Sequence, residues 1–246
     1  MSASFFVSKI IQQTQVTNTI FCMTVKCDLP LKPGQFFMVR GWDGFPLLSR
    51  PISIYDAGPN TVSFLYEVRG EGTKLLSKLQ PGETVELNGP LGNGFEPAKM
   101  KGKVAVVTGG IGFAPMVYTV KQLEDCRVDF FCGFREQSYE LEKVVPYVEN
   151  IQVATDSGIE GHKGFITDLI KVKNYDVVLA CGPEVMMKKL AKMCTEQQVP
   201  CYVSLERHMA CGVGACLGCT CKTVKGAKCI CKDGPVFLGE ELNWDA

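Results

Sequence analysis

Six of the thirteen cysteines lie within 21 residues close to the C-terminal end, and no other feature constrains the fold as strongly. They are Cys211, Cys216, Cys219, Cys221, Cys229 and Cys231. The chain from about Ser204 onward has too few apolar residues for a core of its own, so it needs another source of folding energy. Disulfide frameworks are typical of small secreted domains, and the N-terminal sequence lacks the basic and apolar regions of an export signal. Ligation of a metal centre is therefore the expected source.

The first three of these cysteines have the spacing Cys211-x4-Cys216-x2-Cys219, which is typical of plant-type [2Fe-2S] sites. Glycines between them permit positive φ values and a close approach of the backbone to inorganic sulfide. A site of this type needs one more thiolate farther along the chain.

The fourth ligand is expected to be Cys229 or Cys231, and Cys221 is a weaker candidate because it lies only two residues from Cys219. Cys231 is favoured, because the turn Lys232-Asp233-Gly234-Pro235 follows it directly and would fix its direction. Four of the six thiols could instead hold zinc in a tetrahedral site. Zinc ribbons favour two C-x2-C pairs, whereas the gaps here are four and two residues, so the spacing favours iron and sulfide.

Short runs rich in β-branched and aromatic residues make up the first hundred residues, and turn sequences such as Gln80-Pro81-Gly82 separate them. The runs cover residues 5–15, 19–27, 35–42, 50–57, 61–68 and 83–90. Six strands at this spacing predict a small antiparallel barrel or sandwich. A short helix is expected at Thr73–Leu79, after the turn Gly70-Glu71-Gly72.

Strands and helices alternate in the second part of the chain. Strands are expected at residues 103–110, 127–134, 150–156, 175–182 and 201–206, and helices at 115–125, 138–147, from about 165, and at 184–198. This alternation predicts βαβ units and a doubly wound parallel sheet. The expected fold is therefore multidomain, α+β and α/β: an antiparallel β-barrel (1–98), a doubly wound parallel sheet (99–203) and a small cysteine-rich iron–sulfur domain (204–246).

Charge and hydropathy exclude several classes of protein. Lys and Arg together number 26, as do Asp and Glu, so the formal net charge of zero offers no electrostatic footprint for nucleic acid. No stretch approaches the roughly 18 apolar residues that span a bilayer. We expect a protein without membrane or nucleic-acid partners, located in the cytoplasm.

Two short motifs in the barrel half have the composition of anion sites. Arg50-Pro51-Ile52-Ser53 lies on a predicted strand, where Arg50 and Ser53 point to opposite faces and would meet a phosphate only at the strand's end. Gly70-Glu71-Gly72-Thr73 opens a helix, whose amides and Thr73 hydroxyl could hold a pyrophosphate. A surface arginine beside a turn is the competing interpretation, but two such motifs in one barrel favour a ligand that contains phosphate.

The run Gly109-Gly110-Ile111-Gly112-Phe113-Ala114-Pro115 follows the first parallel strand and opens its helix, as a dinucleotide loop does. Asp156 and Cys181-Gly182-Pro183 end later strands, so they would line the same carboxyl edge of the sheet. The expected nucleotide contacts are Gly109, Gly110, Gly112, Ala114, Pro115, Asp156, Cys181, Gly182 and Pro183. Cys181 is either a buried thiol or faces the nicotinamide. No acid–base pair is evident, so no catalytic side chain is assigned and cofactors are expected to supply the chemistry.

In their order along the chain, R-P-I-S, G-E-G-T, G-P-L-G-N-G-F, G-G-I-G-F-A-P, A-C-G-P and the cysteine spacing resemble the ferredoxin reductase-like superfamily. More narrowly, S-L-E-R-H-M-A-C-G-V-G-A-C-L-G-C and C-K-D-G-P-V-F are similar to electron-transfer subunits of the NAD-dependent, class 1B dihydroorotate dehydrogenases. The resemblance covers nearly the whole chain, and the cysteine segment is its most specific part.

The resemblance implies an FAD-binding barrel, an NAD-binding α/β domain with NAD as substrate, and a C-terminal [2Fe-2S] domain. FAD would contact Arg50, Pro51, Ile52, Ser53, Leu65, Tyr66, Glu67, Gly72 and Thr73. Iron would be ligated by Cys211, Cys216, Cys219 and Cys231. The gap of eleven residues before the last ligand is short for the family, and Glu67 stands where a basic residue is common.

The resemblance also implies a partner, an FMN-containing dihydroorotate dehydrogenase catalytic subunit, in a heterotetramer of two copies of each chain. Electrons would pass between that FMN and NAD by way of the iron–sulfur cluster and FAD, in pyrimidine biosynthesis. NADP in place of NAD stays open, because Arg135 follows the second parallel strand and could meet a 2′-phosphate.

Two alternatives remain at this point. A related flavoprotein subunit of another assembly, either sulfhydrogenase gamma-like or the small subunit of an NADPH:ferredoxin oxidoreductase, would share the domains and cofactors and differ in its partner. A redox sensor without catalytic activity, or a zinc-stabilised binding module, would belong to a different class.

Overall fold

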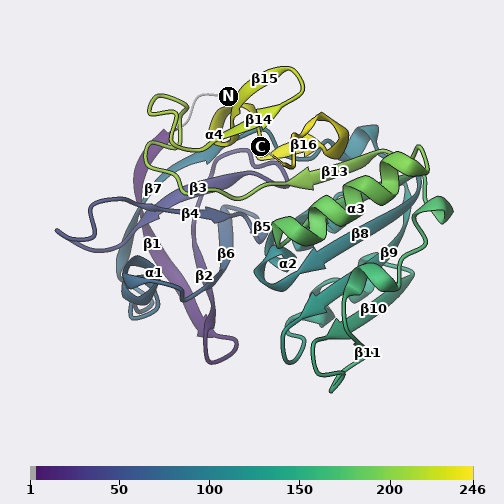
Figure 1. The fold of residues 1–246 in the computed structure, drawn as a ribbon. Helices are drawn as coiled ribbons and strands as arrows, with labels where there is room; N and C mark the ends of the chain where they lie inside the picture. Colours follow the sequence, from purple (N-terminus) through teal and green to yellow (C-terminus); the bar gives the residue numbers. More distant parts are fainter. Residues whose placement is uncertain (1–3, 246) are drawn as a thin grey trace.

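The computed structural model describes residues 4–245 and contains two large sheets and a small hairpin (Figure 1). The first sheet has the order β4-β3-β7-β1-β2-β6-β5 and is antiparallel at every pairing. Its strands are β1 (Ser4–Gln15), β2 (Ile20–Lys26), β3 (Phe36–Arg40), β4 (Arg50–Ser53), β5 (Asp56–Gly58), β6 (Thr61–Glu67) and β7 (Thr84–Leu91). The predicted antiparallel architecture of the first hundred residues is confirmed.

The edges of this sheet are drawn together by the two residues that link β4 to β5. The Ile54 N–H donates to the carbonyl of Gln35, and the Tyr55 N–H donates to that of Ser63, each at 2.9 Å. Phe37, Phe64 and other fully buried side chains fill the interior, where their rings meet edge to face with centroids 5.6 Å apart. The sheet therefore curls around a closed apolar core.

The second sheet has the order β11-β10-β9-β8-β12-β13-β16. Its strands are β8 (Gly102–Gly109), β9 (Cys126–Phe134), β10 (Asn150–Thr155), β11 (His162–Lys163), β12 (Val177–Cys181), β13 (Cys201–Ser204) and β16 (Val236–Leu238). All pairings are parallel except that of β16 with β13. Helix α2 (Phe113–Lys121) packs on one face and α3 (Glu184–Glu196) on the other, so the sheet is doubly wound as predicted.

Two predicted helices are absent. The segment 138–147 forms only two short 3-10 turns, because Glu140 has a φ of +57° and Pro146 lacks the N–H that a helix needs. The segment from Phe165 likewise forms only 3-10 turns. Ile170 and Val172 are both buried there, and a helix would turn two residues at this spacing to opposite sides. The first helix, α1, spans Glu71–Leu76 instead of Thr73–Leu79.

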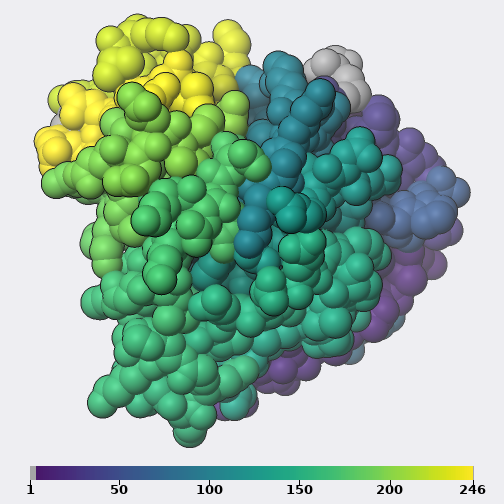
Figure 2. All heavy atoms as spheres, turned by 90° about the vertical axis from the view of Figure 1, so that its right-hand side faces the viewer, coloured from purple at the N-terminus to yellow at the C-terminus, as the bar shows by residue number. Residues whose placement is uncertain are grey.

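The cysteine segment is more regular than its sequence predicted. It contains the hairpin β14 (Thr220–Thr223) and β15 (Gly226–Cys229), the short helix α4 (Ile230–Asp233) and strand β16. Its buried residues share one core with the parallel sheet and with Met38 and Leu91 of the barrel. Figure 2 shows the yellow C-terminal segment packed directly on the green part of the chain that precedes it. The division at residues 98 and 203 stays a prediction, and β16 ties the third segment to the sheet of the second.

The barrel and the parallel sheet also contact each other directly. The Lys121 ammonium of α2 pairs with Asp56 of β5 at 2.6 Å, and the Tyr55 hydroxyl donates to Glu140 at 2.7 Å. None of the helices among residues 4–245 is long and apolar enough to cross a lipid bilayer.

Candidate functional site

Cys211 lies in a loop whose backbone N–H groups point at its sulfur. The amides of Val213 and Cys216 both donate to its Sγ at 3.4 Å. Burial acts to raise the pKa of Cys211, but the donated hydrogen bonds from Cys216, Val213 and Ala215 outweigh it and lower the pKa to about 6. Because the thiolate is the form that ligates metals, this loop is suited to hold iron.

Cys231 lies against the same loop and beside Cys219. Its Sγ accepts the Gly214 N–H at 3.1 Å, and its own N–H donates to the sulfur of Cys219 at 3.4 Å. Burial and the adjacent Cys219 sulfur raise the pKa of Cys231 to about 12. Cys229 instead sits at the end of the hairpin, with its sulfur 3.8 Å from the Thr220 hydroxyl. These contacts favour Cys231 over Cys229 as the fourth ligand.

The arrangement of the sulfurs also bears on the zinc alternative. Within the described range 4–245, no three His, Cys, Asp or Glu side chains are placed around a single metal ion. A structural zinc site needs four ligands around one ion, whereas a [2Fe-2S] cluster divides four cysteines between two irons. The choice of a two-iron cluster over zinc therefore rests on the spacing Cys211-x4-Cys216-x2-Cys219.

In the barrel, the structure brings the two predicted anion motifs together. The Arg50 guanidinium lies over the Trp42 ring, 5.5 Å from its centroid, and donates to the carbonyl of Leu48. It also fills the space beside Gly72: a Cβ on that glycine would lie 2.5–2.8 Å from three of its atoms. Arg50 is thus held at the start of α1, as a shared pyrophosphate site requires.

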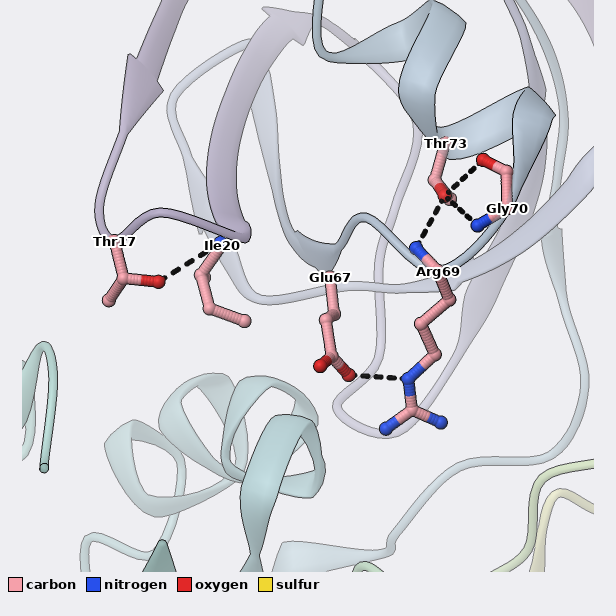
Figure 3. Close-up of polar contacts among 6 residues, drawn as sticks. All are labelled: Thr17, Ile20, Glu67, Arg69, Gly70 and Thr73. Carbon is pink, nitrogen blue, oxygen red and sulfur yellow. Dashed lines mark hydrogen bonds and ion pairs between the residues drawn. The ribbon is translucent and has the colours of Figure 1, made fainter. Parts of the chain in front are cut away.

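Thr73 has a local role that the sequence did not indicate (Figure 3). Its hydroxyl accepts the N–H groups of Arg69 at 3.0 Å and Gly70 at 3.2 Å and donates to the Gly70 carbonyl at 3.0 Å. It therefore caps the first turn of α1, and its contact with a phosphate stays a prediction. Nearby, the Arg69 guanidinium pairs with the Glu67 carboxylate.

The other predicted flavin contacts lie on β4 and β6. They are Pro51, Ile52, Ser53, Leu65, Tyr66 and Glu67. Ile52, Leu65 and Tyr66 are buried, and the Tyr66 hydroxyl accepts a hydrogen bond from Gln13 at 2.9 Å. Their side chains serve the core, so any contact they make with a cofactor would come from the backbone. Pro51, Ser53 and Glu67 keep partial access to solvent.

The predicted nucleotide loops meet at the carboxyl edge of the parallel sheet. A Cβ on Gly112 would collide with the carbonyl of Cys181, and one on Gly182 would lie 2.7 Å from the Gly109 nitrogen. These glycines thus allow the loops after β8 and β12 to pack on each other. Gly110, with a φ of +54° and nothing within 4 Å of its Cβ position, is the one left open for a ligand.

The remaining members of this set have simpler surroundings. Ala114 and Pro115 are buried in the first turn of α2, where they contribute to packing. Pro183 immediately precedes α3. Asp156 follows β10 at the same carboxyl edge and is exposed.

Glu206 is a candidate residue of the functional site that the sequence motifs did not indicate. It follows β13 at the same edge and is exposed. Desolvation by the surrounding protein raises the pKa of Glu206, Arg69 lowers it and Glu67 raises it further. Burial, followed by the charge of Glu206, raises the pKa of Cys181. Glu206 therefore lies within electrostatic range of Arg69 and Glu67 of the barrel half and of Cys181 at the end of β12. Its position at a strand's carboxyl end was the available signal.

Comparison with known proteins agrees with this geometry. Residues 206–243 match the model of the iron–sulfur cluster binding domain of dihydroorotate dehydrogenase B. A protein of Clostridium acetobutylicum, named dihydroorotate dehydrogenase B (NAD(+)), electron transfer subunit, is 50% identical over 242 residues, 98% of each chain. A protein of the same name from Clostridium perfringens is 43% identical over 99% of this chain and 100% of its own.

Solved structures support the same fold. An NADH-dependent reduced ferredoxin-NADP oxidoreductase structure superposes with a TM-score of 0.85 at 28% identity, covering 97% of this chain and 90% of that one. A ferredoxin NADP+ reductase from Neisseria gonorrhoeae with bound FAD and NADP gives 0.64 at 16% identity, covering 84% of this chain and 95% of that one. The resemblance seen in the sequence is confirmed: the chain belongs to the family of electron transfer subunits of the NAD-linked oxidoreductase dihydroorotate dehydrogenase B, on a ferredoxin reductase-like fold.

Proposed function

We propose that this chain holds FAD on the barrel, NAD at the carboxyl edge of the parallel sheet and a [2Fe-2S] cluster in the C-terminal segment. Arg50, kept in place by Trp42 and Gly72, would bind the FAD pyrophosphate. When bound, the flavin exchanges electron pairs with the nicotinamide and single electrons with the cluster. The chain's own residues bind and orient these groups.

Cys211, Cys216, Cys219 and Cys231 would ligate the irons, while the amides of Val213, Cys216 and Gly214 donate to two of the sulfurs. Hydrogen bonds of this kind stabilise negative charge on sulfur and tune the reduction potential of the cluster. The glycine loops after β8 and β12 would hold the nucleotide phosphates, with Gly110 offering the closest approach.

The partner is proposed to be the FMN-containing catalytic subunit that oxidises dihydroorotate, with two copies of each chain in the complex. No dihydroorotate site is evident in the described residues, so the chemistry needs a second chain. The cluster loop presents Val213 (48% exposed) and Leu217 (63% exposed) to solvent, and we place the contact with the partner at Met209–Leu217.

NAD is proposed as the nucleotide rather than NADP. The exposed carboxylate of Asp156 lies at the carboxyl edge, where an acidic side chain suits a ribose hydroxyl and repels a 2′-phosphate. We place the protein in the cytoplasm. No cysteine among residues 4–245 forms a disulfide, as expected in a reducing compartment.

The observation that best supports this function is the cysteine loop, whose backbone amides donate to the sulfurs of Cys211 and Cys231. The test is a visible spectrum with iron, sulfide and flavin analysis of the purified chain. We expect one flavin, two irons and two sulfides per chain. The isolated chain should oxidise NADH with an artificial acceptor only.

Adding the partner should give dihydroorotate:NAD activity. A colourless zinc protein would refute the proposal. A flavin- and iron-loaded chain that supports no dihydroorotate oxidation with its partner would point to a different assembly.

A further inference from the structure

The motif G-P-L-G-N-G-F at residues 89–95 joins the barrel to the parallel sheet and has no part in the sites described above. Asn93 lies in it, two residues after the end of β7. The residue is exposed, yet its backbone N–H and C=O and its side-chain NH2 group all form hydrogen bonds. Its partners lie far away in the sequence.

Four hydrogen bonds connect Asn93 to one short segment. Its N–H donates to the Gly234 carbonyl at 2.5 Å, and its carbonyl accepts the Val236 N–H at 3.4 Å. Its side-chain Nδ2 donates to the carbonyls of Lys232 at 2.9 Å and Asp233 at 3.2 Å. All four therefore reach residues 232–236, which directly follow Cys231.

These carbonyls belong to the end of helix α4, which contains Cys231. The last carbonyls of a helix lack partners within it, and here the Asn93 amide supplies the missing donors for two of them. The turn is also closed from inside, because the Gly234 N–H donates to Ile230 at 3.1 Å and the Asp233 carboxylate accepts the Cys229 N–H at 2.7 Å. The backbone around Cys231 is thereby fixed in one conformation.

On its other side, the Asn93 loop is anchored to the barrel. The buried Gln35 side chain donates to the Gly92 carbonyl at 3.0 Å and accepts the Lys32 N–H at 2.9 Å. The Phe95 N–H donates to Pro33 at 2.9 Å. A continuous set of hydrogen bonds thus runs from the start of β3 through Asn93 to the backbone next to Cys231.

We propose that Asn93 is a positioning residue for the iron–sulfur site: its amide fixes the backbone of the fourth ligand, Cys231, against the flavin-binding barrel. The inference rests on the proposed function in so far as Cys231 ligates iron. It assigns to the G-P-L-G-N-G-F motif the task of holding the cluster in a constant place relative to the barrel.

The chemistry of the side chain gives a sharp test. Both partners of Nδ2 are carbonyl oxygens, so only an NH2 group suits the position. Asn93→Asp keeps the shape but turns a carboxylate oxygen toward two carbonyls, which is repulsive. Asn93→Ala removes the donors without repulsion. If the hydrogen bonds hold the cluster in place, Asn93→Asp should lose iron faster than Asn93→Ala. If only the shape of the side chain matters, Asn93→Asp should lose iron no faster than the wild type.

The experiment measures iron release to a coloured ferrous chelator, bathophenanthroline disulfonate, from the reduced chain purified with its partner subunit. Losing two hydrogen bonds should speed release by on the order of tenfold in Asn93→Asp, and by less in Asn93→Ala. The electron paramagnetic resonance signal of the reduced cluster should broaden or shift in both, while flavin content stays unchanged. Asn18→Asp, the same change at an exposed turn between β1 and β2, is the matched control and should match the wild type.

A wild-type chain with a full cluster and equal release rates from Asn93→Asp, Asn93→Ala and Asn18→Asp overturns the inference alone. A wild-type chain without iron and sulfide overturns the proposed function, and the inference with it. Should Asn93→Asp fail to fold, the comparison of Asn93→Ala with the wild type decides by the same criterion.

Discussion

Gly72→Ala should weaken FAD binding through Arg50, a residue far from it in sequence. The new Cβ would lie 2.5, 2.6 and 2.8 Å from the Arg50 Nε, Cζ and Nη2 atoms, so the guanidinium must leave its place beside α1. An arginine that no longer meets the pyrophosphate forfeits a hydrogen bond to a charged group, which is worth about 1.5–3 kcal/mol. At 1.4 kcal/mol per factor of ten, FAD affinity should fall roughly 10- to 150-fold.

The assay is titration of the deflavinated chain with FAD, followed by quenching of flavin fluorescence. Gly70→Ala is the matched control: its Cβ meets nothing within 4 Å, and its φ of −160° is extended backbone that alanine adopts. A double-mutant cycle completes the design, because Gly72→Ala should add almost nothing once Arg50 is already alanine. Unchanged FAD affinity in Gly72→Ala, or full additivity in the cycle, would refute the argument.

Three further outcomes are expected. Cys231→Ser should remove most of the iron and the visible cluster absorbance, whereas Cys229→Ser should keep both, as iron analysis will show; the reverse result would exchange the ligand assignment. Asp156→Ser should raise kcat/KM for NADPH relative to NADH in the diaphorase assay by about tenfold, because removing the carboxylate removes repulsion of a 2′-phosphate; an unchanged ratio would remove Asp156 from nucleotide selection. Asp129→Ala should lower the free energy of unfolding by about 3 kcal/mol at neutral pH, since Asp129 is buried and accepts hydrogen bonds from Lys103, Asn150 and Tyr175. Burial opposes the ionisation of Asp129, but these contacts lower its pKa. The stabilisation that its carboxylate gives to the folded state is therefore complete above the ordinary carboxyl pKa of about 3.9, and it fades as the pH falls below that value. Chemical denaturation at pH 7 and pH 3 should show the gap between wild type and variant narrowing in acid.

Local patterns in the sequence were enough for the main architecture. Short β-branched and aromatic runs between turns mark the first sheet, and apolar runs that end in glycines mark the second. Both patterns involve residues close together in the sequence, so both sheets were predictable. The absent helix at 138–147 shows the limit of such patterns, because the left-handed φ of Glu140 leaves no trace in hydropathy.

The candidate site divides in the same way. Cysteine spacing is local, so the ligand set could be proposed from the sequence. The roles of Trp42 and Asn93 depend on partners brought close only by folding, and no spacing rule relates Asn93 to residues 232–236. Thr73 shows that a local motif can also have more than one meaning. Its motif suggested a phosphate contact, but a hydroxyl three residues after Gly70 is equally well placed to cap its own helix.

The pairing of β16 with β13 has a consequence for how the protein is made. During translation β13 is synthesised before β16. Until β16 is made, the edge of β13 is unpaired and can pair with a strand of another chain. The cysteine segment between them must therefore emerge before the edge is covered. The open edge of the parallel sheet is therefore covered only once the cysteine segment has been made in full.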